Sequence, residues 1–179
     1  MILHGFLRCW GLPDLSPFVT KLDCYLRMTG TKFEYQPMPP DGLASYPQGK
    51  APYIDYEGQK LGDSSEIIAA LEKKNKLDGH LLPEQRALGL LMQRTLERDV
   101  YYQIVQNRWI QNFDAYCGEM GKATGAPADF FKGALKPVAD GYVTMLKVDG
   151  MGRHPPAFYE KRVLQDFEAI DTFMGSKPY

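Results

Sequence analysis

The segment Ser16-Pro17-Phe18-Val19 has residue types and a spacing that could do chemistry. It follows a short apolar run and begins a stretch with helical periodicity. If cysteines stood at the first and last of these four positions, the segment would be a dithiol redox site. Serine and valine occupy these positions instead, so dithiol exchange is impossible. The segment still places one polar side chain, that of Ser16, at a helix N-terminus. We therefore predict that the Ser16 hydroxyl donates a hydrogen bond to a bound thiolate. Ser16 is also a favoured N-cap before a proline, and capping alone would explain it.

The elements that must position Ser16 alternate between strand and helix in the first part of the chain. The apolar run at 2–7 predicts a strand, 16–29 a helix, and 32–38 a second strand. A loop rich in proline and glycine at 39–49, a hairpin at 52–61 and a helix beginning at Asp63 follow. The order βαβ followed by ββα predicts a mixed four-stranded sheet with packed helices. This pattern is typical of an α/β thioredoxin-like domain, here over residues 1–77.

The rest of the chain is predicted to be all-helical. Residues 78–83 have the composition of an interdomain linker. The periodicity predicts helices over 84–111, 130–148 and 157–174, with a loop at 118–127 and a turn at 149–156. Residues 84–179 therefore form a predicted all-α domain.

Composition and charge exclude several classes of function. The 179 residues are 44% hydrophobic and 24% charged, which is typical of a soluble globular chain. A net charge of −1 gives no reason to expect nucleic acid or an acidic membrane as a partner. The three cysteines and three histidines have no metal-ligand spacing, so no metal is expected. An odd cysteine count and the lack of an apolar run of about 20 residues predict a cytoplasmic protein without a membrane span.

Three motifs occur in a recognisable order: Ser16-Pro17-Phe18, Gly49-Lys50-Ala51-Pro52 and Asp63-Ser64-Ser65. With a thioredoxin-like half followed by an all-helical half, the chain resembles the cytosolic glutathione S-transferase superfamily. Further segments at 11–18, 101–109 and 150–154 make it similar to the branch of failed-axon-connections and metaxin-like proteins and their bacterial relatives. The resemblance implies a glutathione S-transferase-like fold with glutathione as co-substrate. It implies no metal cofactor, and it allows a homodimer.

The resemblance implies a role for Ser16 and for the motif that ends in Pro52. Ser16 would be the catalytic group that stabilises the glutathione thiolate. A cis peptide bond before Pro52 would turn the backbone of Ala51 toward the ligand, where it pairs with the cysteinyl amide like an added strand. Lys50 would meet the glycyl carboxylate, or else it is a solvated surface lysine.

The resemblance also implies a site for the other end of glutathione, at Asp63 and Ser64. The helix N-terminus with Ser64 would bind the free carboxylate, and Asp63 would pair with the ammonium group. Related transferases often carry a longer Gln or Glu before the serine, so Asp63 has a shorter reach. Capping of the helix explains the same two residues, and both roles are compatible.

An apolar co-substrate would meet aromatic side chains, for which Trp10, Tyr102 and Trp109 are the candidates. Trp10 lies on the loop that leads to Ser16. The other two belong to an aromatic stripe at helical spacing, a pattern that core residues also produce. Cys9, a rival nucleophile, lies at the end of the first strand, where no helix dipole favours its ionisation.

These observations favour transfer of glutathione to a small electrophile. The alternative is a non-catalytic adaptor of the metaxin type, whose surface binds protein partners. A glutathione-dependent thiol reductase is disfavoured, because it needs a cysteine at position 16. Arg153-His154 is expected to be a structural tie between helices. Relatives continue beyond the final segment 174–179 into another helix, so we expect the all-α domain to be truncated at its C-terminal end.

Overall fold

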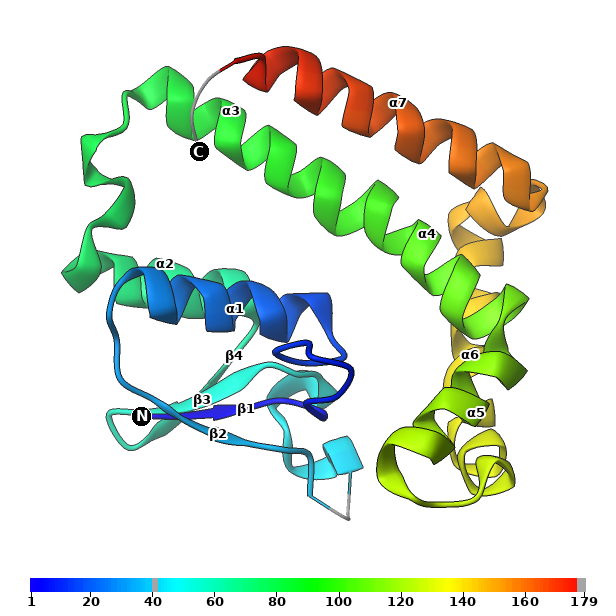
Figure 1. The fold of residues 1–179 in the computed structure, drawn as a ribbon. Coiled ribbons are helices and arrows are strands. Elements are labelled where there is room, and N and C mark those ends of the chain that lie inside the picture. Colours follow the sequence, from blue (N-terminus) through cyan, green and yellow to red (C-terminus); the bar gives the residue numbers. More distant parts are fainter. Residues whose placement is uncertain (40–41, 177–179) are drawn as a thin grey trace. The chain divides into compact units, whose positions relative to one another are not determined.

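The computed structural model describes residues 1–39 and 42–176 of the chain. They divide into two compact units, Met1–Leu81 and Leu82–Tyr179, which Figure 1 shows in blue to green and in green to red. The predicted mixed sheet followed by a helical part is confirmed. No helix in these two described stretches has the length and apolar character needed to cross a membrane.

The first unit is a sheet with strand order β2-β1-β3-β4. β1 pairs in parallel with β2 and antiparallel with β3, which pairs antiparallel with β4. Helices α1 and α2 lie together over one side of this sheet (Figure 1). The elements are β1 (Ile2–His4), α1 (Pro17–Met28), β2 (Glu34–Gln36), the 3-10 turns η1 (Gly42–Ser45) and η2 (Pro47–Gly49), β3 (Tyr53–Tyr56), β4 (Gln59–Gly62), α2 (Ser64–Asn75) and the 3-10 turn η3 (Leu77–His80).

The two faces of the sheet bury different side chains, because neighbouring residues of a strand point to opposite faces. Leu3 and Ile54, paired across β1 and β3, lie in an apolar core with residues of α1 and α2. The next pair, His4 and Tyr53, stacks with ring centroids 4.0 Å apart. Tyr46 packs edge-on against Tyr53 at 4.6 Å. The aromatic side of the sheet is therefore covered by the connection between β2 and β3.

The regular elements of the second unit are all helices or helical turns in its described residues. A continuous helical segment runs through α3 (Pro83–Thr95), the π-helical turn η4 (Leu96–Val100), α4 (Tyr101–Val105) and the π-helical turn η5 (Gln106–Gln111). It is followed by α5 (Phe113–Thr124), α6 (Ala128–Asp149), the 3-10 turn η6 (Met151–Arg153) and α7 (Pro156–Met174). Val105, Leu146 and Tyr159 form the fully buried centre of this unit.

The predicted loop at 118–127 is wrong over most of its length, because α5 continues to Thr124. Gly121, which lies within this segment, is required for packing. A Cβ atom there would lie 2.8 Å from the carbonyl oxygen of Ala126 and 3.3 Å from the nitrogen of Ala128. Gly121 therefore allows the end of α5 to approach the beginning of α6. The first strand was predicted over 2–7, but β1 covers only Ile2–His4. Residues 177–179 of the final segment lie outside the described residues.

Candidate functional site

The register of the sheet brings the three sequence motifs to one end of the first unit. His4, the last residue of β1, pairs with Tyr53 at the beginning of β3, and Tyr53 pairs with Gly62 at the end of β4. The chain leaves β1 here toward Ser16, enters β3 here from Pro52, and leaves β4 here into Asp63. Both α1 and α2 therefore begin at this end of the sheet, with their unpaired backbone N–H groups.

Ser16 is the N-cap of α1, as predicted from Ser-Pro, and only 8% of it is exposed. Its Oγ accepts a hydrogen bond from the backbone nitrogen of Val19 at 3.4 Å, which is long for such a bond. Within residues 1–39 and 42–176, the hydroxyl proton of Ser16 has no acceptor. The hydroxyl thus caps the helix as an acceptor and keeps its donor function available.

Asp14 holds Ser16 in place, and the sequence analysis missed it. Only 2% of Asp14 is exposed, and its Oδ1 accepts the backbone N–H of Ser16 at 2.8 Å. Its Oδ2 accepts the backbone N–H of Phe6 at 2.8 Å and the hydroxyl of Tyr35 at 2.6 Å. Asp14 therefore connects the end of β1, strand β2 and the cap of α1. An aspartate two residues before a helix N-cap is the local signal that could have found it.

Burial dominates the electrostatics of Asp14. It raises the pKa of the Asp14 carboxyl group above its ordinary value of 3.8, although the hydrogen bonds from Tyr35 and the backbone act in the opposite direction. A cation lies beside Tyr35, the partner of Asp14: the guanidinium of Arg8 is 4.0 Å from the centre of the Tyr35 ring. Arg8 in turn pairs with the buried carboxylate of Asp23 on α1 at 2.9 Å.

Substitution of Gly5 by alanine should destabilise the first unit, because Gly5 packs directly against Asp14. A Cβ atom at position 5 would lie 2.3 Å from Asp14 Oδ2 and 2.8 Å from the Tyr35 ring. We expect a loss of about 1–3 kcal/mol in the free energy of unfolding, measured by denaturant titration with circular dichroism. Gly133→Ala is the control, since a Cβ there meets nothing within 4 Å and a helical alanine should be neutral or stabilising. Unchanged stability of Gly5→Ala would contradict this packing.

The motif at the beginning of β3 has the predicted backbone form, because the Ala51-Pro52 peptide bond is cis. Pro52 is fully buried and Ala51 is half-buried. Lys50 is exposed at the end of η2, and its backbone N–H donates to the carbonyl oxygen of Pro47 at 3.2 Å.

The Asp63-Ser64 motif caps α2. Asp63 has a positive φ of 68°, and its Oδ1 accepts the backbone N–H groups of Ser65 at 2.8 Å and Glu66 at 3.3 Å. Ser64 is buried, with 4% exposed. The Lys21 ammonium donates to Ser65 Oγ at 3.1 Å, which connects α1 to the first turn of α2. The capping role is thus present, and both cap bonds use the same carboxylate oxygen, Oδ1.

The aromatic candidates divide between the two units. Trp10 lies in the first unit on the loop before Ser16, with a positive φ of 53° and 45% of its surface exposed. Tyr102 and Trp109 belong to the second unit, where both pack against its buried centre. Trp109 lies 5.4 Å from the ring of Tyr142. Cys9 is half-buried, and the prediction that it lies at the end of the first strand is wrong, because β1 ends at His4 and Cys9 belongs to the segment between β1 and α1. In the described part of the chain, no group of three His, Cys, Asp or Glu residues could hold a metal ion.

Comparisons with known proteins find one matching family model and related proteins. A family model described as the glutathione S-transferase N-terminal domain matches residues 17–115. The isoprene-epoxide–glutathione S-transferase of Rhodococcus sp. (strain AD45) is 33% identical over 190 aligned residues, covering 99% of this chain and 77% of that protein. Failed axon connections of Drosophila melanogaster is 32% identical, over 99% of this chain and 44% of that protein. No solved structure matches the chain. The two relatives confirm the resemblance that the motifs indicated.

Proposed function

Because this chain belongs to the glutathione S-transferase family and has its fold of a thioredoxin-like sheet and a helical part, we propose that it transfers glutathione to small electrophiles. The observation that carries the proposal is the state of Ser16. Its hydroxyl lies at the N-terminus of α1 with its oxygen engaged by Val19 and its proton available. A donor of this kind is what a bound thiolate needs.

The energy required is within reach of one serine at a helix end. A free thiol has a pKa of about 8.5, and lowering it by two pH units requires about 2.7 kcal/mol. A hydrogen bond to a charged group contributes about 1.5–3 kcal/mol. A helix N-terminus adds about 0.3–1 kcal/mol for a nearby anion. Ser16 at the cap of α1 supplies both contributions.

The other motif residues at this end of the sheet bind the rest of the tripeptide in this proposal. Ala51 pairs with the cysteinyl amide through its backbone, and the exposed Lys50 meets the glycyl carboxylate. At the beginning of α2, Ser64 and the helix N-terminus take the γ-glutamyl carboxylate, and Asp63 pairs with the ammonium group. Glutathione would then extend between the beginnings of α1 and α2, with its sulfur at Ser16.

The reaction is a nucleophilic substitution by sulfur. Glutathione loses its thiol proton to solvent, and Ser16 donates a hydrogen bond to the thiolate. The sulfur attacks an electrophilic carbon, a new C–S bond forms, and the bond from that carbon to its leaving atom breaks. We propose small epoxides as the first electrophiles to test, because the Rhodococcus relative is named for an epoxide. In that case the C–O bond opens and the alkoxide takes a proton from water.

The second candidate is a non-catalytic protein of the same fold that binds protein partners. It is supported by the similarity to Failed axon connections, whose name states no transferase activity. The two candidates differ in glutathione binding, which an adaptor does not need.

Retention on immobilised glutathione tests the proposal. We expect the wild-type chain to be retained and to be released by free glutathione. Asp63→Asn should be retained less, because asparagine keeps the N-cap of α2 and removes the charge that pairs with the ammonium group. Ser45→Ala, an exposed position on η1, is the control and should behave as wild type. A folded wild-type protein that washes through the column would favour the adaptor.

A further inference from the structure

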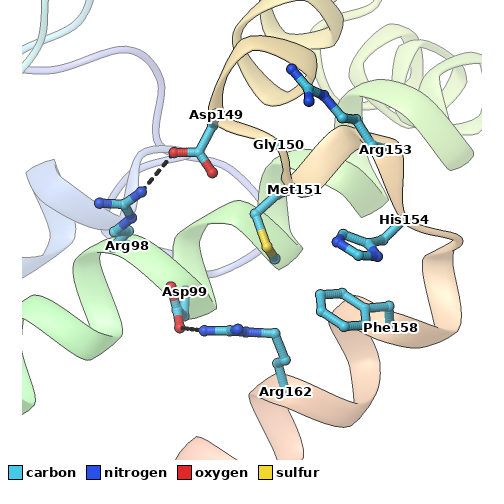
Figure 2. A pocket seen from close by; sticks show the side chains of 9 residues that line it. All are labelled: Arg98, Asp99, Asp149, Gly150, Met151, Arg153, His154, Phe158 and Arg162. Carbon is cyan, nitrogen blue, oxygen red and sulfur yellow. Dashed lines mark hydrogen bonds and ion pairs between the residues drawn. The ribbon is translucent and has the colours of Figure 1, made fainter.

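A pocket of about 600 Å³ lies entirely within the second unit, and the proposed transfer reaction does not use it. Its walls come from η4, the C-terminal end of α6, η6 and the first turns of α7 (Figure 2). The volume falls in the range of about 300–1,000 Å³ typical of small-molecule sites. The pocket includes Arg153-His154, the segment whose chemistry the sequence alone did not reveal.

The charged wall of the pocket has an excess of guanidinium groups. Arg98 Nη2 pairs with Asp149 Oδ2 at 2.6 Å, and Arg162 Nη2 pairs with Asp99 Oδ2 at 2.7 Å. Arg153 donates through Nε to the carbonyl oxygen of Lys147 at 3.2 Å. Three arginines against two aspartates leave one positive charge in the lining. Each ion pair engages one terminal nitrogen, so the guanidinium groups retain further N–H donors for a planar anion.

A second part of the lining presents flat rings beside Arg162, whose guanidinium carbon lies 5.9 Å from the centre of the Phe158 ring. The imidazole of His154 stacks on the ring of Phe158, with centroids 3.9 Å apart and an angle of 13° between the planes. Met151 lies between this stacked pair and the ion pairs (Figure 2). A planar ring of a ligand could therefore pack against His154 and Met151 while its charged end reaches the arginines.

Two backbone features hold these walls in position. Arg98 and Asp99 are consecutive residues of the π-helical turn η4, yet one reaches the end of α6 and the other reaches α7. Such turns are rare and occur frequently at functional sites. At η6, a Cβ on Gly152 would lie 2.8 Å from backbone atoms of Leu146 and Lys147. This close approach fixes the loop that carries Arg153 and His154 against α6, and a preformed site loses less entropy on binding.

We propose that this pocket binds a small aromatic carboxylate. The carboxylate is held by Arg98 and Arg162, and the ring lies against His154 and Met151. Both arginine side chains are partly exposed, 64% and 45%, so a small ligand in solution can reach them. The site is independent of Ser16, and its test gives the same answer whether or not the chain is a transferase.

NMR signals of the histidine rings test the proposal in the wild-type chain. The sequence has three histidines, so His154 is identified by comparison with His154→Asn. Benzoate should shift the His154 signals saturably and leave those of His4 and His80 in place. Benzamide carries the ring without the charge, and acetate carries the charge without the ring. Each should bind about tenfold more weakly than benzoate, which corresponds to about 1.4 kcal/mol. Equal shifts from benzoate and benzamide, or no saturable shift from benzoate, would overturn the proposal.

Variants locate the charge recognition. Arg98→Gln and Arg162→Gln should each weaken benzoate binding about tenfold, a loss of about 1.4 kcal/mol. Arg94→Gln is a closely matched control, because the Arg94–Glu97 pair has the same side-chain exposures, 64% and 17%, as the Arg98–Asp149 pair. It should bind benzoate as wild type does, and an equal loss in Arg94→Gln would contradict the site. If circular dichroism shows that Arg98→Gln does not fold, the comparison of benzoate with benzamide decides alone.

Discussion

Ser16→Ala should slow glutathione conjugation about ten- to a hundredfold at neutral pH, with a much smaller change in glutathione affinity. The variant loses one hydrogen bond to the thiolate, worth about 1.5–3 kcal/mol. Affinity is largely preserved because Lys50, Ala51, Asp63 and Ser64 would bind the rest of the tripeptide without the hydroxyl. The measurement is a pH–rate profile with a generic aromatic electrophile, in which the alanine variant should need a higher pH to reach the same rate.

Two variants separate the chemistry of Ser16 from its structural role. Ser16→Thr keeps a hydroxyl and a favourable N-cap, so it should retain part of the activity. Ser45→Ala removes an exposed hydroxyl of the same unit and should leave the profile unchanged. Equal profiles for wild type and Ser16→Ala, with both proteins folded, would reduce Ser16 to a helix cap.

Asp14→Ala should destabilise the first unit by about 2–5 kcal/mol, since it leaves the N–H groups of Phe6 and Ser16 without their acceptor. The Tyr35 hydroxyl loses its acceptor as well. Denaturant unfolding followed by circular dichroism measures the loss. Asp55→Ala is the control in the same sheet, because the Asp55 side chain is 42% exposed and its pairing with His4 should contribute about 1 kcal/mol or less. A loss for Asp14→Ala no larger than that for Asp55→Ala would contradict the role given to Asp14.

Because Asp14 titrates, its contribution to the free energy of unfolding depends on pH. Burial raises the pKa of Asp14 in the folded chain above 3.8, so the folded state binds the proton more tightly than the unfolded state. The stability that this contributes is complete below about pH 3.8 and is lost as the pH rises through the raised pKa. Asp14→Asn has no such titration. The stability of wild type relative to Asp14→Asn should therefore decrease as the pH rises from 3.8 toward neutrality.

The parts of the molecule that depend on local sequence were predictable. Ser16 and Pro17 marked the beginning of α1, Asp63 marked the beginning of α2, and the pattern of residues 52–61 indicated the hairpin. Each of these signals lies within a few residues of the feature it specifies. The order of strands and helices then gave the four-stranded sheet, because short connections leave few topologies.

The parts that depend on distant residues were not predictable from pattern. Asp14 joins Tyr35 across 21 residues, and nothing near Asp14 in the sequence announces this partner. Gly121 lies in the segment predicted as a loop, yet it is part of α5, and its lack of a side chain allows α5 to meet α6. Arg153-His154 became interpretable only when the fold placed it beside Arg98, more than 50 residues earlier in the chain. In each case a tertiary contact decides the role of the residue.

The pKa of the glutathione thiol in the bound complex tests the central claim most directly. It is measured by following the ultraviolet absorbance of the thiolate as a function of pH, with the wild-type chain saturated with glutathione. We predict a thiol pKa well below the free value of about 8.5 in wild type, and a return toward that value in Ser16→Ala. A bound thiol that titrates at the same pH in wild type, in Ser16→Ala and in free solution would contradict the account.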